Sequence, residues 1–507
     1  MNFKVVLAIA GFVLLAGKEA TAQISSYAEE ALMISRIRPG GTARMQGMGG
    51  VQNALGGDLS SAYYNPAGLG MYNRSDFSFT PAYVMANTSS TYLGNNTSEN
   101  KNSLIIPNLG IAFHTNKDGS KGLWGGTFAI NFNRINDFNN SFSYQGTNKD
   151  NSIIDYFINN ANGTGTSQFN SNTGYNFNTP TGLAYNNYLI GPKTILGPTG
   201  DSTQYFTDVS GIPLQKETVK NSGAQNQWSF SYGANFNDKI FVGGGIGLTT
   251  FKYKSQTTYT ESFSDAAQPM SYMQLDESLS LSGSGINATL GTIIRPMDAF
   301  QFGLSVATPT SYLITDNYNA TMSSTWKNFQ YEPGVVLNNE HFATDLVTSN
   351  YNLSTPWRFS GGATFFIQKR GLISADAEWL NYSSTNFSST TTGVSYSGDN
   401  TKIKGLYKST VNIRVGGEYR VNNYRFRAGY SMMPDPFQTQ QNGVDRSLYS
   451  YSVGLGYRTS SFYVDMAVIY GQGNKSYRPY TVNTPTSPLV MLNNTSTSIM
   501  FTIGIPF

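Results

Sequence analysis

The chain has 507 residues, of which only 12% are charged, and it contains no cysteine. Soluble domains carry about 25% charged residues, so the composition is not typical of a water-soluble enzyme. A net charge of +3 gives no reason to expect a nucleic-acid partner, which needs a concentrated basic stripe. Disulfides and thiolate metal sites are excluded, and His114 and His341 are the only histidines. We therefore expect no metal and no cofactor.

The rest of the composition favours strands and long loops. The chain has 33 Tyr, 31 Phe and 52 Gly, together with many Asn, Ser and Thr residues. These residue types favour extended backbone and turns over helix. A hydrophobic content of 39% and a mean hydropathy of -0.30 exclude a helical membrane bundle. The composition predicts an all-β protein.

The N-terminus has the pattern of a signal peptide. Lys4 precedes an apolar run over residues 5–16, and Ala20-Thr21-Ala22 supplies small residues for cleavage. We expect residues 1–22 to be removed, although a buried N-terminal helix is the alternative. After Ala22 no window approaches 18 apolar residues, so any membrane crossing must use strands that close into a barrel.

Strict alternation of apolar and polar residues marks the crossing strands. It is cleanest at the C-terminus, where Ile499, Phe501, Ile503, Ile505 and Phe507 share one face. The same test gives an even number of strands. An even number places the first and the last strand end on the periplasmic side of the membrane. The fourteen candidate strands are 75–86, 104–115, 122–134, 225–237, 240–260, 274–294, 299–315, 355–368, 371–382, 409–420, 424–433, 446–458, 461–471 and 495–507.

The connections between these strands alternate between short and long. Short periplasmic turns and long extracellular loops are typical of outer-membrane barrels. The longest loop spans about 135–224, and its apolar patches near Ile153 and Leu189 predict a folded extracellular cap with one or two short helices. We therefore assign residues 74–507 to an antiparallel transmembrane barrel of fourteen strands.

Residues 23–73 fit no strand and predict a small helical hatch. A helix starts near Ala28 and ends at Pro39-Gly40-Gly41, and a second short helix follows Asp58, which is expected to cap it. The lumen of a fourteen-stranded barrel is wider than barrel side chains alone can fill. We expect the hatch to plug it.

The hatch resembles that of the FadL family of outer-membrane transporters for hydrophobic compounds. The resemblance lies in residues 41–50, with Gly47, Gly49 and Gly50, in residues 54–58, and in residues 63–69. Within the last stretch Asn65, Pro66 and Ala67 form the family's most recognisable triplet. The segments 355–363, 376–379 and 427–430 are similar to strand motifs of the same family, whereas the loops at 135–224 and 320–350 show no such similarity.

The resemblance implies passive uptake of long-chain fatty acids or similar lipophiles across the bacterial outer membrane. In that family the ligand is caught on extracellular loops, enters a lumen pocket and leaves sideways where the third strand kinks. Gly125 and Gly126 lie in the third predicted strand, and glycine inside a strand often marks a bend. These glycines are candidates for the lateral gate, or they make room for the hatch.

The resemblance and the sequence also predict partners. We expect a hydrophobic small-molecule ligand, contact with outer-membrane lipid and lipopolysaccharide, and a monomer. The terminal aromatic residue Phe507 resembles the signal that the outer-membrane barrel-assembly machinery recognises.

Eight charged residues fall on the inward face of neighbouring predicted strands. A fatty-acid carboxylate prefers an arginine or lysine partner when it leaves water, so Arg414 or Arg427 is a candidate anchor. The alternative is a mutually paired charge network that braces lumen and hatch. The eight residues are Arg358, Asp376, Glu378, Arg414, Glu418, Arg420, Arg425 and Arg427.

Three functions other than transport are each compatible with part of the sequence pattern. A general diffusion porin would share the polar lumen and long loops but not the hatch, and a loop-based adhesin is supported only by loop length. An outer-membrane phospholipase needs a serine next to a histidine, and neither His114 nor His341 is predicted mid-strand at the lipid face. We therefore expect no enzymatic activity.

The run Gly243-Gly244-Gly245-Ile246-Gly247 lacks the helix and lysine of a phosphate-binding loop.

Overall fold

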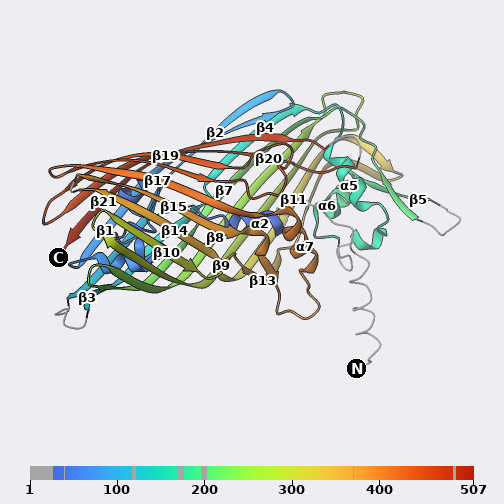
Figure 1. Ribbon diagram of the computed structural model, residues 1–507. Coiled ribbons are helices and arrows are strands. Elements are labelled where there is room, and N and C mark those ends of the chain that lie inside the picture. Colours follow the sequence, from blue (N-terminus) through green and yellow to red (C-terminus); the bar gives the residue numbers. More distant parts are fainter. Residues whose placement is uncertain are drawn as a thin grey trace.

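The computed structural model describes residues 27–38, 40–116, 122–169, 176–195, 202–368, 370–483 and 487–507. The predicted signal peptide, residues 1–22, lies outside the described residues. Most strands form one antiparallel sheet, which closes because the first strand, β1, pairs with the last, β21, from Asp76 opposite Pro506 to Thr91 opposite Met491. Figure 1 shows the resulting barrel with tilted strands.

The barrel wall has fourteen strand positions within the described residues, as predicted. Four positions are shared by strands in line: β3 with β4, β10 with β11, β12 and β13 with β14, and β15 with β16. The strands are β1 Asp76–Tyr92, β2 Asn95–Asn116, β3 Leu123–Asp137, β4 Asn140–Thr147, β7 Leu214–Phe236, β8 Ile240–Ser262, β9 Met270–Met297, β10 Phe300–Ala307, β11 Ser311–Glu332, β12 Val335–Ala343, β13 Val347–Ser354, β14 Arg358–Ile367, β15 Gly371–Asn381, β16 Asn386–Ser388, β17 Ser409–Val421, β18 Tyr424–Met433, β19 Leu448–Arg458, β20 Tyr463–Tyr477 and β21 Val490–Pro506.

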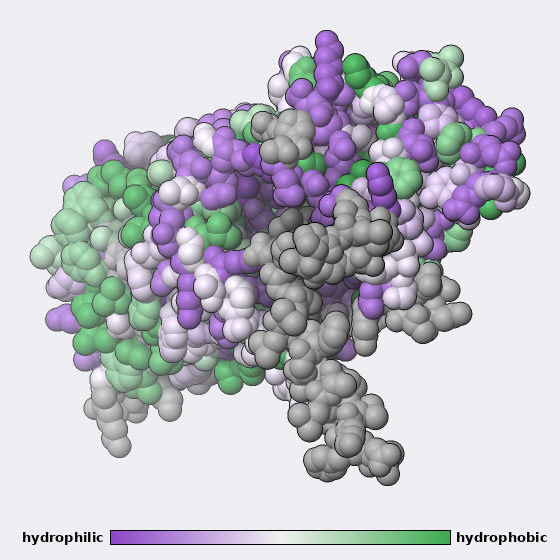
Figure 2. Space-filling model, turned by 90° about the vertical axis from the view of Figure 1, so that its right-hand side faces the viewer, coloured by the Kyte–Doolittle hydropathy of each residue, from purple (hydrophilic) through white to green (hydrophobic). Residues whose placement is uncertain are grey.

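The two ends of the barrel differ, and we name them the turn end and the loop end. The turn end holds the C-terminus and the short connections, such as the one between β17 and β18. The loop end carries the long connections, including helices α5 Ile153–Ala161, η2 Thr166–Phe169, α6 Pro180–Asn186, η3 Tyr382–Ser384 and α7 Ser397–Leu406, and the hairpin β5 Gly191–Ile195 with β6 Ser202–Phe206. Hydrophilic residues dominate this end, whereas hydrophobic residues gather on the wall (Figure 2).

Alternation places apolar side chains outward and polar ones inward. In β21, Phe501 and Ile503 are 44% and 51% exposed, whereas Thr502 between them is fully buried. The pattern is required because the wall must be apolar toward lipid while the lumen faces the hatch.

The strands extend further toward the loop end than alternation predicts. β7 begins at Leu214 and β4 covers residues assigned to the loop, so the segment 135–224 contains less loop than expected. On β8 the outward residues change from Leu248 to Thr250, Lys252 and Lys254 while pairing continues. Backbone pairing continues there past the last apolar outward residue, because outward side chains beyond the lipid no longer need to be hydrophobic.

The hatch lies inside the barrel. It comprises α2 Tyr27–Ser35, α3 Ala43–Gln46, α4 Ser61–Tyr64 and η1 Pro66–Met71. Among the described helices, none is long and apolar enough to cross a membrane. At the loop end, α2 packs with α5, α6 and inward side chains such as Phe251 and Tyr351 in the largest hydrophobic core. The lumen is thus filled at two levels, by the hatch and by the helices of the loops.

A plugged lumen with an interrupted wall

Glycines on both sides bring the hatch backbone against the barrel wall. A side chain at Gly416 or Gly429 would overlap the backbone of Met48 or Gly49. Gly49 also needs its positive φ of 71°, and its N–H donates to Ser452 Oγ at 3.0 Å. Hatch and wall therefore fit backbone to backbone, which larger residues at these positions would prevent.

The Asn65-Pro66-Ala67 triplet docks on a second group of wall glycines. Asn65 Nδ2 donates to Asn53 O at 2.7 Å, and its Oδ1 accepts from Ala67 N at 3.2 Å. A side chain at Gly291 would overlap Asn65, and one at Gly243 would overlap Pro66. The run beginning at Gly243 thus makes space for the hatch. The triplet ties one hatch loop to another and to the wall.

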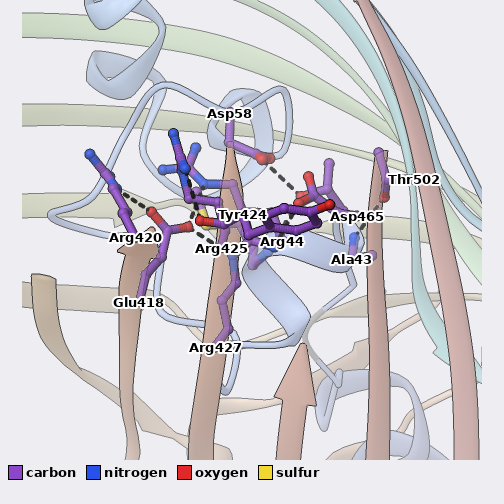
Figure 3. A network of polar contacts seen from close by, with 12 residues as sticks. Ala43, Arg44, Asp58, Glu418, Arg420, Tyr424, Arg425, Arg427, Asp465 and Thr502 are labelled. Carbon is purple, nitrogen blue, oxygen red and sulfur yellow. Dashed lines mark hydrogen bonds and ion pairs between the residues drawn. The ribbon is translucent and has the colours of Figure 1, made fainter. Parts of the chain in front are cut away.

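A buried charge network holds the hatch from the other side (Figure 3). Glu418 accepts from Arg427 Nε at 2.8 Å and from Arg420 Nε at 2.7 Å, and it lies 3.8 Å from Arg44 of the hatch. Arg427 also donates to Asp465 Oδ1 at 2.6 Å. The network ties α3 to β17, β18 and β20.

A second network lies beside it. Arg414 Nη2 donates to Glu378 Oε1 at 3.4 Å, and Asn412 Nδ2 donates to the same oxygen at 2.9 Å. Arg358 Nη1 donates to the Tyr63 hydroxyl at 2.7 Å. Asp376 accepts from the backbone N–H groups of Gln52 and Asn53 at 2.6 and 2.9 Å. Inward charges therefore bind the hatch as well as one another.

These contacts bear on the two arginines predicted as carboxylate anchors. Arg414 and Arg427 are 5% exposed, and each is paired with a carboxylate of the wall. The geometry favours the alternative of a bracing network, since neither guanidinium faces open space.

A cavity of about 510 Å³ lies between α2 and the wall formed by β1, β2, β3 and β18 to β21. We call it the luminal cavity. Its lining combines apolar side chains, charged side chains and neutral polar side chains such as Asn87, Asn136 and Ser450. The apolar lining comprises Leu32, Met33, Ala82, Val84, Ile105, Pro107, Ile135, Phe138, Met433, Leu448, Ile469 and Met500; the charged lining comprises Glu29, Glu30, Arg36, Arg38, Arg134, Asp137, Arg446 and Lys475.

One of these charged groups is open to the cavity. Arg38 is exposed, and in the described part of the chain its guanidinium makes no hydrogen bond or ion pair. Asp137 acts on it through its charge, but Asp137 is ion-paired with Arg134 at 3.1 Å. Arg36, by contrast, donates to the backbone oxygens of Met433 and Pro434 at 3.1 and 3.0 Å. Arg38 is therefore a cation that faces a cavity lined by both apolar and polar side chains.

The wall beside the luminal cavity is interrupted. β2 and β3 pair from Asn116 opposite Gly125 up to Asn108 opposite Asn133, where the described pairing ends. At this level β2 has an irregularity at Pro107, opposite Pro81 of β1, and β3 shifts register against β7 between Arg134 and Asn136. Pro107 lacks an N–H to continue the ladder. Nearer the loop end, Ser143 Oγ of β4 donates to Glu99 Oε1 of β2 at 2.8 Å.

Both edges of this interruption line the luminal cavity, Ile105 and Pro107 from β2 and residues 134–140 from β3 and β4. We name it the β2–β3 gap. Outside it, Leu104 and Ile106 are 79% and 45% exposed. The luminal cavity thus lies behind the part of the wall where, among the described residues, the β2–β3 ladder has ended.

The predicted gate glycines lie nearer the turn end than the gap. Gly125 and Gly126 remain paired with β2, although β3 also shifts register against β7 between Leu123 and Gly125. Side chains at these positions would approach His114 and overlap Tyr232, respectively. The glycines therefore accommodate wall side chains of neighbouring strands. Pro107 was the sequence signal for the gap itself, because proline inside a strand interrupts pairing.

Neither histidine lines the luminal cavity. His114 Nδ1 is 3.0 Å from Thr127 Oγ1, and its Nε2 is 2.7 Å from Asn116 Oδ1. His341 Nδ1 is 2.9 Å from Ser323 Oγ on the hairpin of β11 and β12, where both lie in a solvent-exposed contact.

A family model described as outer membrane protein transport protein (OMPP1/FadL/TodX) matches residues 22–503. A comparison with curated protein sequences found no match. Among solved structures, the chain is similar to a FadL homologue of Pseudomonas aeruginosa at 13% identity, with a TM-score of 0.55 and coverage of 93% of this chain and 99% of that chain. It is also similar to the toluene transporter TodX of Pseudomonas putida at 12% identity, with a TM-score of 0.50 and coverage of 93% and 99%.

Proposed function

The chain belongs to this family of outer-membrane transport proteins, and we propose that it passes long-chain fatty acids or similar lipophiles through the luminal cavity and out sideways into the membrane. Its barrel is integral to the outer membrane. In the proposed orientation the loop end faces the outside of the cell and the turn end faces the periplasm.

The proposal rests on one combination of features: the lumen is plugged, and the barrel wall is interrupted beside the luminal cavity. The hatch is fastened to the wall through glycine contacts and two buried charge networks. An aqueous solute would have no wide path along the barrel axis. An apolar solute in the luminal cavity, however, meets the β2–β3 gap, whose edges Ile105 and Pro107 line that cavity.

The energetics suit such a route. Burial of apolar area stabilises a molecule by about 25 cal/mol per Å². The free energy of a lipophile therefore falls when it leaves water for the cavity, and it is low again when the molecule reaches lipid. Lateral release into the membrane core avoids returning the molecule to water. The gradient of the lipophile itself drives net uptake, and no nucleotide is needed.

We infer further that the ligand carries a carboxylate. Arg38 lines the cavity, and its guanidinium has no hydrogen-bonding partner among the described residues; Leu32 and Met33 line the same cavity. A guanidinium in this position suits a long-chain fatty acid better than a neutral hydrocarbon, because the carboxylate supplies the charge-assisted hydrogen bonds that Arg38 lacks.

The ligand class is tested by binding measurements on R38Q. We expect affinity for oleate to fall about tenfold, the loss of about 1.4 kcal/mol that one charged hydrogen bond contributes. Affinity for oleyl alcohol should not change. R370Q removes the same charge from an exposed residue of a turn and should bind both ligands normally. Equal loss for both ligands in R38Q would instead assign Arg38 a structural role.

Uptake itself is tested against the porin alternative. Bacteria that lack other fatty-acid transporters and express this chain should take up radiolabelled oleate, while the purified protein in planar bilayers should conduct ions weakly. Strong ion conductance without oleate uptake would mean that the barrel is a general diffusion porin.

A further inference from the structure

Four lysines lie together on the outer wall near the loop end. Lys216 and Lys220 belong to β7, and Lys252 and Lys254 belong to β8. All four are exposed, while their neighbours Glu217 and Phe251 point inward and are buried. In the described part of the chain, no hydrogen bond or ion pair to these ammonium groups is found. We call these residues the lysine patch.

The patch is dense, and the carboxylates on the β2 and β3 side of it already have partners. Asp137, which lies in the same row as Lys252 across Ala224, is ion-paired with Arg134. Glu99 accepts from Ser143 Oγ. Lys252 and Lys254 share one face two residues apart, which is about 7 Å along a strand. Lys254 pairs with Ser222 and Gln256 pairs with Lys220, so Lys220 and Lys254 are diagonal neighbours. The outward residues on the adjoining strands are serines: Ser141 and Ser143 of β4, and Ser278, Ser280 and Ser282 of β9.

The nearest outward carboxylate further along β9 is already bonded. Asp276 accepts from Thr258 Oγ1 and from Gln274 Nε2, each at 2.6 Å. Like charges held this close repel one another. An anion outside the protein would relieve that repulsion.

The patch begins where the outer wall changes from apolar to polar. Leu248 gives way to Thr250 on β8, Ile286 to Ser284 on β9, and Leu313 to Thr315 on β11. Leu248, Ile286 and Leu313 are 46%, 53% and 67% exposed. In an outer-membrane barrel this border marks the level where acyl chains end and headgroups begin.

A groove of about 770 Å³ runs along the same border beside Lys252. Its polar lining comes from Thr250, Ser282, Ser284 and Thr315 and from Asn350 and Asn352 of β13, and Leu313 lies at its apolar side. Hydroxyl and amide groups of this kind bind sugar hydroxyls. The groove and the lysine patch together offer contacts for acyl chain, sugar and phosphate at the appropriate heights.

We propose that the lysine patch and this groove bind the phosphorylated sugar headgroup of a glycolipid in the outer leaflet, of the lipid A type. Lysine ammonium groups donate to phosphate oxygens, and the groove binds the sugar. The acyl chains lie against Leu248, Ile286 and Leu313. This inference rests on the outer-membrane location and does not depend on which molecule the lumen carries.

The test measures lipid binding to purified protein in detergent by native mass spectrometry. We expect wild-type protein to retain bis-phosphorylated lipid A, and K220Q/K252Q/K254Q to reduce the bound fraction about tenfold. The matched variant K149Q/K404Q/K408Q removes three exposed lysines elsewhere at the loop end and should bind normally. Unboiled gel mobility checks that each variant is folded.

Two results would overturn the proposal. One is equal retention by the K220Q/K252Q/K254Q variant and the wild type. The other is equal retention of dephosphorylated lipid A or phosphatidylglycerol by the wild type, since either would remove the requirement for a phosphorylated sugar. A further measurement needs no substitution: about 0.5 M salt, which screens exposed charges, should release lipid A from the wild type.

Discussion

Charged side chains inside the barrel serve the hatch. Arg427 is 5% exposed and contacts both Glu418 and Asp465, and Glu418 in turn contacts Arg44 of α3. A buried charge without its partner is costly. Arg427, which alternation placed on the inward face as a candidate ligand anchor, is therefore better explained as a residue that fixes the hatch to the barrel wall.

The R427A substitution distinguishes these two roles. It leaves Asp465 without its arginine, so we expect the free energy of unfolding to fall by about 3 kcal/mol. Unfolding in urea, followed by loss of the compact form on unboiled gels, measures this change. Oleate affinity of the folded fraction should be unaltered. A variant of normal stability that binds oleate poorly would restore Arg427 as an anchor.

A buried carboxylate on α2 makes the docking of this helix depend on pH. Glu30 is 4% exposed and accepts from the Tyr351 hydroxyl at 2.6 Å. The pKa of Glu30 is raised from 4.5 to about 8, mainly by burial; the Tyr351 hydrogen bond opposes the rise, and the charge of Asp316 contributes to it. The folded state therefore holds a proton that the unfolded chain has already released.

The sign of the effect follows from this proton. Stability should fall as pH rises from about 4.5 to about 8, by at most about 1.4 kcal/mol per pH unit. E30Q cannot titrate, so its unfolding temperature should change less between pH 5 and pH 9, and at pH 9 it should exceed that of the wild type. Parallel curves for the two proteins would show that Glu30 does not control this dependence.

At the scale of elements, the period of the strands was predictable and their length was not. Alternation located all fourteen wall positions, because lipid requires an apolar outer face. It missed the loop-end half of β7, which begins at Leu214 rather than near residue 225 and whose outward residues there include Lys216 and Lys220. The helices α5 and α6 fall within the loop for which short helices were expected.

The functional features divide in the same way. The hatch motif at Asn65 could be recognised from the sequence, because the Asn65-Pro66-Ala67 triplet and the glycines near it resemble a known family motif. The unpaired state of the Arg38 guanidinium among the described residues was not, since it depends on the three-dimensional placement of Asp137, which is ion-paired with Arg134. The β2–β3 gap needed the pairing register, although Pro107 hinted at it.

Adjacent glycines of β17 test how the hatch is seated. Gly416 faces Met48 of the hatch, whereas Gly417 faces outward, where an added Cβ would lie 3.3 Å from Leu372 O and 4.0 Å from Ile373 Cγ1. We expect G416A to loosen the hatch and raise ion conductance in planar bilayers. G417A is the matched control and should conduct like the wild type. Equal conductance of both variants would argue that the hatch tolerates a methyl group at its closest contact.

At the scale of the whole molecule, a closed wall, an internal plug and one interruption act together. The hatch and the helices of the loops fill the lumen, and the luminal cavity lies between them and the gap. In the proposed function, a ligand that enters from the loop end leaves sideways through the β2–β3 gap into lipid. The same architecture leaves the outer wall free to bind glycolipid at the lysine patch.

The most direct test of this route seals the β2–β3 gap. The chain contains no cysteine, so I105C/I135C can be joined by a bismaleimide across the gap, and I111C/I130C, already opposite each other in the paired region, serves as the control. Oleate uptake by whole cells should stop when the gap is cross-linked and continue in the cross-linked control. Undiminished uptake through a sealed gap would contradict lateral release.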